Sequence, residues 1–179
     1  MKNMKWRFTL LLAVVAAALV TAAAATAATI TATATLTGAG ALSLNVPATA
    51  SLSATLTGVD QTVNYSPVLG LVDARGTGAG WNLTMASTTF SDGGGHTLAA
   101  GTVSAASAAC HSGSTCTAPT SGVGYPITLS TTASKIFQAA VNTGLGQVDV
   151  TPTVGVLVPG SAYAGTYTAT VTVAAVSGP

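Results

Sequence analysis

The segment Thr29-Ile30-Thr31-Ala32-Thr33-Ala34-Thr35-Leu36-Thr37 decides the fold class, because polar and apolar side chains alternate along its length. Side chains that alternate with a period of two lie on opposite faces of an extended chain, and the branched β-carbon of threonine favours a strand. The segment therefore predicts a half-buried β-strand. Similar runs predict further strands at residues 42–46, 52–56, 81–85, 127–129, 148–158 and 167–173.

Clusters of glycine, proline, asparagine and aspartate separate these runs, for example at residues 76–80 and 91–95. Such residues supply the positive or fixed φ angles that tight turns require. Many short strands with this spacing are typical of a sandwich, so we expect an all-β, antiparallel β-sandwich of the Ig-like or Greek-key type. Residues 99–124, rich in Ala, Ser, Gly and Thr, predict a long loop. Residues 133–141 are the one place where a helical turn is expected.

The N-terminus has a different composition from the rest of the chain. Residues 1–8 carry three basic side chains, residues 10–20 are almost entirely Leu, Ala and Val, and residues 25–27 read Ala-Thr-Ala. This order is typical of a secretory signal peptide. We expect a signal peptide helix at residues 1–28, removed after Ala27 or Ala28, and one domain at residues 29–179. The alternative is a membrane anchor, although the apolar core is shorter than the roughly 20 residues that a spanning helix needs.

Charged residues are scarce, at 5% of the chain, whereas about 25% is usual for a soluble domain. Beyond the leader the only cations are Arg75 and Lys135. Two cations cannot neutralise a series of phosphates, which excludes nucleic acid and anionic membrane surfaces as partners. No second long apolar run and no LPxTG sorting pentapeptide occur, so we expect no membrane span after export and a non-covalent attachment to any surface.

The two cysteines, Cys110 and Cys116, lie six residues apart in a Ser/Gly/Thr-rich segment. An oxidising extracellular compartment favours a disulfide between them. The alternative is a metal site that also uses His96 and His111, but a fourth nearby ligand is missing. We therefore expect a disulfide and no metal.

Reactive groups are too few for a typical hydrolase. The chain has two histidines, four aspartates and no glutamate, and no two carboxylates lie close together in the sequence. A nucleophile needs a neighbouring base, and glycoside cleavage needs a pair of carboxylates. Asp92 precedes three glycines and predicts a turn, because one carboxylate cannot build a calcium shell. We expect no enzymatic activity and no cofactor.

Two features near residue 80 allow both a structural and a binding interpretation. Asp73 and Arg75 are the only opposite charges two residues apart after the leader; they form either a structural ion pair or part of a site in which the guanidinium clamps an oxygen. Trp81, Leu83 and Met85 lie on one strand face, which indicates a core face. Trp81 is also suited to the rim of a groove, where its ring would stack on a sugar.

The sequence Leu71-Val72-Asp73-Ala74-Arg75-Gly76-Thr77-Gly78-Ala79-Gly80-Trp81-Asn82-Leu83 resembles the first signature of the WxL domain family of cell wall-binding proteins of Gram-positive bacteria. The matching residues are Asp73, Arg75, Gly76, Gly80, Trp81 and Leu83. Residues 159–172 resemble the closing strand of the family. The second Trp-x-Leu is degenerate, because Val173 and Ala175 occupy its Trp and Leu positions.

This resemblance implies a secreted cell-surface protein that attaches non-covalently to peptidoglycan or an associated wall polymer. It implies binding residues in the first motif, namely Trp81, Asp73, Arg75, Leu83 and Asn82. Other surface proteins are further expected partners. The alternative function is a structural or assembly subunit of a surface layer or appendage that binds other proteins through its sheet edges.

Overall fold

The computed structural model describes residues 31–38 and 40–179, and the expected signal peptide helix lies outside this part. The chain divides into a short unit, Met1–Thr35, and a compact unit, Leu36–Pro179. Within the described residues, all strands belong to the second unit, and there is no helix, so none that could span a membrane. The strands are β1 (Ser43–Asn45), β2 (Gln61–Tyr65), β3 (Leu69–Asp73), β4 (Trp81–Ser87), β5 (Phe90–Ser91), β6 (Thr97–Leu98), β7 (Thr102–Cys110), β8 (Ile127–Thr128), β9 (Ser134–Ala139), β10 (Gly146–Val158) and β11 (Val171–Ser177).

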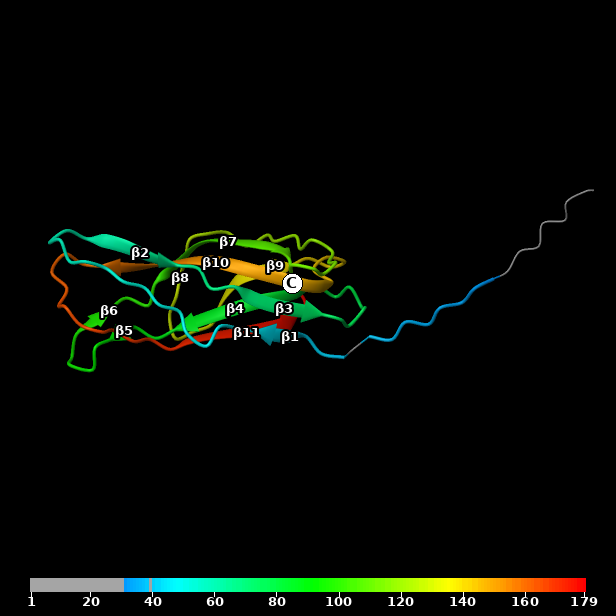
Figure 1. The fold of residues 1–179 in the computed structure, drawn as a ribbon, viewed down its shortest axis with the longest axis horizontal. Helices are drawn as coiled ribbons and strands as arrows, with labels where there is room; N and C mark the ends of the chain where they lie inside the picture. Colours follow the sequence, from blue (N-terminus) through cyan, green and yellow to red (C-terminus); the bar gives the residue numbers. More distant parts are fainter. Residues whose placement is uncertain (1–30, 39) are drawn as a thin grey trace, which may run out of the picture. The chain divides into compact units, whose positions relative to one another are not determined.

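The larger sheet is organised around β10, which has 13 residues (Figure 1). The strand order is β1-β3-β10-β7-β8. β3 pairs with residues 146–150 of β10, and β2 pairs with residues 154–158 farther along the same strand. Val148, Val150, Val154 and Val156 are fully buried, as the period-two pattern of this run predicts.

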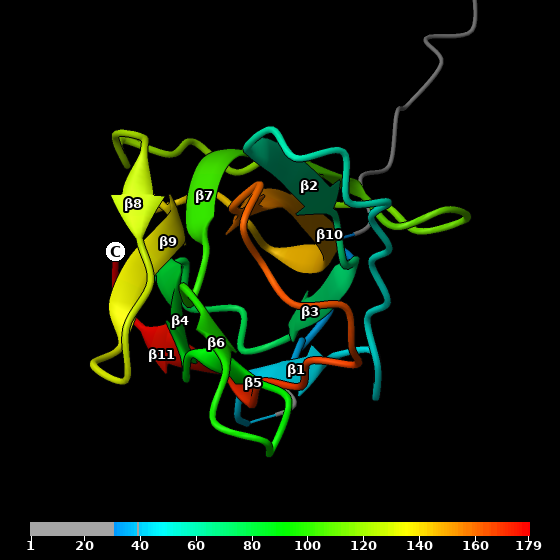
Figure 2. The ribbon, with the colours of Figure 1, turned by 90° about the vertical axis from the view of Figure 1, so that its left-hand side faces the viewer.

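A second sheet of three strands, β11-β4-β9, provides the opposite side of the core. All pairings in both sheets are antiparallel. Figure 2 shows β4, β9 and β11 across the interior from β3 and β10. Trp81, Leu83 and Met85 of β4 pack with the inward residues of β3 and β10 in one core cluster. The expected all-β antiparallel architecture is confirmed.

Several local expectations are wrong. Residues 31–37 and 52–56 alternate in sequence but form no strand. The expected loop at residues 99–124 contains the nine-residue strand β7, and the expected helical turn at residues 133–141 is the strand β9. The closing strand begins at Val171 rather than at residue 167. β2 and β3 were not expected as strands.

The expected disulfide is present between Cys110 and Cys116. Cys110 ends β7 opposite Val148, and Cys116 forms a bridge to Gly146. The bond therefore closes a short loop against the first residues of β10. Both sulfurs are in the disulfide, so neither cysteine is a free thiolate for the alternative metal site with His96 and His111.

Reducing this disulfide is expected to lower the free energy of unfolding by about 2 kcal/mol, because the unfolded chain regains the entropy of a short loop. Urea unfolding with and without dithiothreitol measures the difference. The double variant Cys110→Ser/Cys116→Ser is the control, and its unfolding should not respond to reductant. An unchanged midpoint for the wild type on reduction would contradict the prediction.

Candidate functional site

The turn between β3 and β4 carries the residues that the sequence singles out. Gly76, Gly78 and Gly80 have φ angles of 70°, 64° and 71°, which favour glycine. A side chain at Gly80 would also collide with β9, because a Cβ there would lie 2.4 Å from the carbonyl oxygen of Ala139. The turn from β3 to β4 therefore favours glycine at all three positions and leaves no room for a side chain at Gly80.

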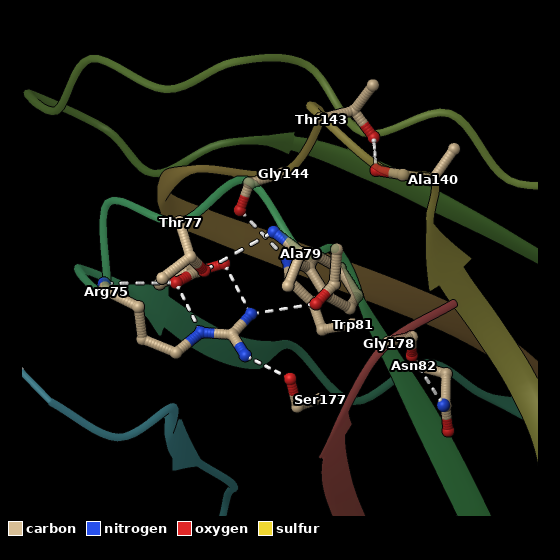
Figure 3. A network of polar contacts seen from close by, with 12 residues as sticks. Arg75, Thr77, Ala79, Trp81, Asn82, Ala140, Thr143, Gly144, Ser177 and Gly178 are labelled. Carbon is tan, nitrogen blue, oxygen red and sulfur yellow. Dashed lines mark hydrogen bonds and ion pairs between the residues drawn. The ribbon is translucent and has the colours of Figure 1, made fainter.

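Asp73, at the end of β3, and Arg75, in the turn, form a two-pronged ion pair, and Figure 3 shows the Arg75 guanidinium with its polar contacts. Nε and Nη2 of Arg75 donate to the two carboxylate oxygens of Asp73, each at 2.8 Å. The Asp73 side chain is completely buried and that of Arg75 is 10% exposed. The hydrogen bond from Arg75 lowers the pKa of Asp73, against the opposing effect of burial, and the same bond raises the pKa of Arg75.

The same guanidinium ties the turn to the last strand. Nη2 of Arg75 also donates to the carbonyl oxygen of Gly80 at 2.8 Å, and Nη1 donates to Oγ of Ser177 in β11. The Gly80 carbonyl accepts a second hydrogen bond from the backbone N–H of Gly178. Arg75 thus links β3, the turn and β11, and four of its five guanidinium N–H groups donate within the protein.

Trp81 lies in the core and not at the rim of a groove. It is fully buried, and its Nε1–H donates to the carbonyl oxygen of Gly144 at 2.9 Å. The Phe137 ring packs against it with a centroid distance of 6.0 Å. A Cβ on Gly144 would lie 2.5 Å from Nε1 of Trp81, so the loop after β9 fits the indole closely. Of the two interpretations of Trp81, the structure shows the core residue.

Asn82 and Leu83 complete the set expected to bind a ligand. Leu83 is fully buried, and Asn82 is half-buried with its amide donating to the carbonyl oxygen of Gly178 at 2.8 Å. The structure therefore brings Asp73, Arg75 and Trp81 together, but as a structural junction. A direct contact of Trp81, Asp73 or Leu83 with a wall polymer is incompatible with their burial.

The degenerate second motif lies next to the first. Val173 and Ala175 of β11 pair with Met85 and Leu83 of β4, and both are partly buried against the core. Val173 also lines a cavity of about 330 Å³ between the sheets, together with Tyr65, Leu69 and Met85. The Tyr65 hydroxyl is buried there without a hydrogen-bond partner among the described residues, and burial raises its pKa.

An exposed cluster that sequence reasoning missed lies at the other end of β4, on the β5–β6 hairpin. Asp92 and His96 form the expected turn, in which Oδ1 of Asp92 accepts from the backbone N–H groups of Gly94 and His96. Oδ2 of Asp92 lies 2.5 Å from Nδ1 of His96. The His96 ring stacks on Tyr163, which comes from the loop between β10 and β11. The Asp-x-x-x-His spacing in the sequence indicates the contact between Asp92 and His96, but nothing local in the sequence indicates the contact between His96 and Tyr163.

Comparison with known proteins gives one match. A family model described as "WxL domain surface cell wall-binding" matches residues 42–172, a range that contains β1 to β10 and the first residues of β11. No curated protein and no solved structure matches the chain. The matched range includes the Asp73–Arg75 pair and Trp81.

Proposed function

Because this chain belongs to the family of WxL domain surface cell wall-binding proteins, we propose that it is exported by a Gram-positive bacterium and held on the wall by non-covalent binding to peptidoglycan. Cell wall binding at the cell surface is the property that the family match gives. Export, the loss of the leader and the choice of peptidoglycan are the proposed parts.

The observation that carries the proposal is the match over residues 42–172, which spans most of the compact unit. The leader-like composition of residues 1–28 and the disulfide support export, since disulfides persist outside the cytosol. The scarcity of charge supports a largely uncharged polymer as ligand. The ion pair neutralises Arg75, and Lys135 is the only other cation in the described part of the chain.

A sedimentation assay with purified sacculi tests the proposal. We expect the mature protein to sediment with untreated sacculi and also with sacculi from which acid treatment has already removed the covalently attached polymers. Denaturant should release the protein from both preparations. Retention that disappears with the acid treatment would assign binding to an attached polymer instead. Absence of retention on either preparation would contradict the proposed function.

One observation favours the alternative of an assembly subunit. β11 ends the three-stranded sheet, and two of its apolar residues, Val171 and Val176, are 37% and 50% exposed. An unpaired edge strand with apolar side chains is a template for pairing with another chain. Size-exclusion chromatography of the same preparation separates the functions, because polymers without sacculus binding would favour assembly.

A further inference from the structure

The exposed cluster of Asp92, His96 and Tyr163, here called the aromatic platform, lies at the end of the domain that carries β5 and β6 (Figure 1). Its two halves come from distant parts of the chain, and a backbone bridge between Ser91 and Thr168 holds them together. β4 separates the platform from Trp81, because Trp81 begins that strand and β5 follows its far end.

The platform presents aromatic surface in a fixed orientation. The His96 and Tyr163 rings stack with a centroid distance of 3.9 Å and an interplanar angle of 25°. Tyr163 is nevertheless 65% exposed, and the His96 side chain is 41% exposed. The hydroxyl of Tyr167 donates to the carbonyl oxygen of Tyr163 at 3.0 Å and so fixes the loop. Because the rings are already ordered, a ligand that stacks on them loses little additional conformational entropy.

The platform also offers a defined polar group. The pKa of Asp92 is lowered, chiefly by its hydrogen bond with His96, so the carboxylate is an acceptor and Nδ1 of His96 is the donor. A neutral imidazole that donates through Nδ1 accepts through Nε2. In this neutral form Nε2 is an acceptor, and it has no hydrogen-bond partner in the described part of the chain.

A groove of about 550 Å³ runs beside the stacked rings. Its apolar walls include Phe90, Leu52 and the Tyr163 and Tyr167 rings, and Ser51, Ser53 and Thr166 add hydroxyl groups. Aromatic walls with a few polar groups are the usual composition of a site for a small organic ligand. The groove lacks any cation, which makes it unsuited to an anionic polymer.

We propose that the aromatic platform and its groove form the glycan-binding site of this protein, which takes a neutral N-acetylated hexosamine chain. The C–H face of one sugar stacks on the face of Tyr163 that His96 leaves free, a hydroxyl or amide N–H of a neighbouring sugar donates to Nε2 of His96, and the next sugar lies in the groove. The proposal rests on the proposed function, because peptidoglycan is a polymer of N-acetylated hexosamines. It moves the contact from the buried first motif to the opposite end of β4.

The test combines a soluble probe with sacculi. The tetramer of β-1,4-linked N-acetylglucosamine is titrated into the mature protein while the ring protons of His96 and Tyr163 are followed by NMR. We expect these resonances to shift, and Tyr163→Ala to weaken both tetramer binding and sacculus retention about tenfold through loss of the stacked ring. Tyr163→Phe keeps the ring and should bind like the wild type. Val141→Ala, at a 57% exposed position in the loop after β9, is the control for an unrelated exposed site.

The outcomes separate this proposal from the proposed function. Sacculus retention of Tyr163→Ala equal to that of the wild type would overturn the platform and leave wall binding intact, as would tetramer-induced shifts confined to residues near Trp81. Ring shifts at His96 and Tyr163 without sacculus retention would support the glycan site and overturn wall binding. The absence of both ring shifts and sacculus retention would overturn both proposals. Since Tyr163 is exposed, circular dichroism should show each Tyr163 variant to be folded.

Discussion

Trp81→Ala is expected to lower the free energy of unfolding by about 3–5 kcal/mol, the usual cost of deleting a large buried aromatic side chain. The indole is fully buried between the sheets and packs on Phe137. Its removal also leaves the Gly144 carbonyl without the Nε1–H donor. Because a domain is stable by only about 5–15 kcal/mol, a large share of its stability is lost. Urea unfolding followed by circular dichroism measures the change.

Trp81→Phe separates packing from hydrogen bonding at this position. Phenylalanine keeps an apolar ring but has no donor for the Gly144 carbonyl, so we expect a smaller loss, about 1–3 kcal/mol. The variant should therefore fold at room temperature. Equal stability of the wild type and Trp81→Ala would show that the indole does not stabilise the core, and would remove the basis for its structural role.

The second large effect is expected at the buried ion pair. Asp73→Ala leaves Arg75 with 10% exposure and no carboxylate partner, and Arg75→Ala leaves a completely buried carboxylate without its guanidinium. Breaking a buried pair by removing one partner costs about 3–5 kcal/mol. The double variant should be destabilised by much less than the sum of the two single variants, because it leaves no charge unpaired. Strictly additive effects in this double-mutant cycle would contradict a coupled pair.

The pair also predicts a pH dependence with a definite sign. The pKa of Asp73 is lower in the folded protein than its usual value of about 3.9. The stabilisation is therefore fully present above about pH 4 and is lost as the pH falls below that value toward the folded pKa. Asp73→Asn should lose this part of the acid dependence, which unfolding curves between pH 2 and pH 6 would reveal.

The alternating pattern predicts the fold class correctly but does not locate every strand. It succeeds in β4 and β10, where alternate side chains are fully buried. It fails at residues 31–37 and 52–56, where the same alternation has no neighbouring strand to pair with. Conversely, β7 has the composition of a loop, and it is a strand because β10 provides a long antiparallel partner along residues 148–155, with one register shift between Thr153 and Val154. Pairing depends on distant segments, which local composition does not encode.

The first motif illustrates the same limit for the site. Its order of charge, glycine turn and aromatic residue identifies the family correctly, but it does not show whether the side chains face solvent. The burial of Trp81 depends on Gly144 and Phe137, more than 50 residues away in sequence. The aromatic platform likewise depends on a contact between His96 and Tyr163 that only the fold creates. Tertiary contacts therefore decide which side chains of the first motif and of the aromatic platform are available to a ligand.

A side-by-side sedimentation of folded Trp81→Phe and folded Tyr163→Ala with sacculi distinguishes a structural first motif from a binding one. We predict that Trp81→Phe sediments like the wild type, since its ring never reaches the surface, and that Tyr163→Ala stays largely in the supernatant. Retention of Tyr163→Ala together with loss of Trp81→Phe, both with native circular dichroism spectra, would contradict this assignment and return the contact to the first motif.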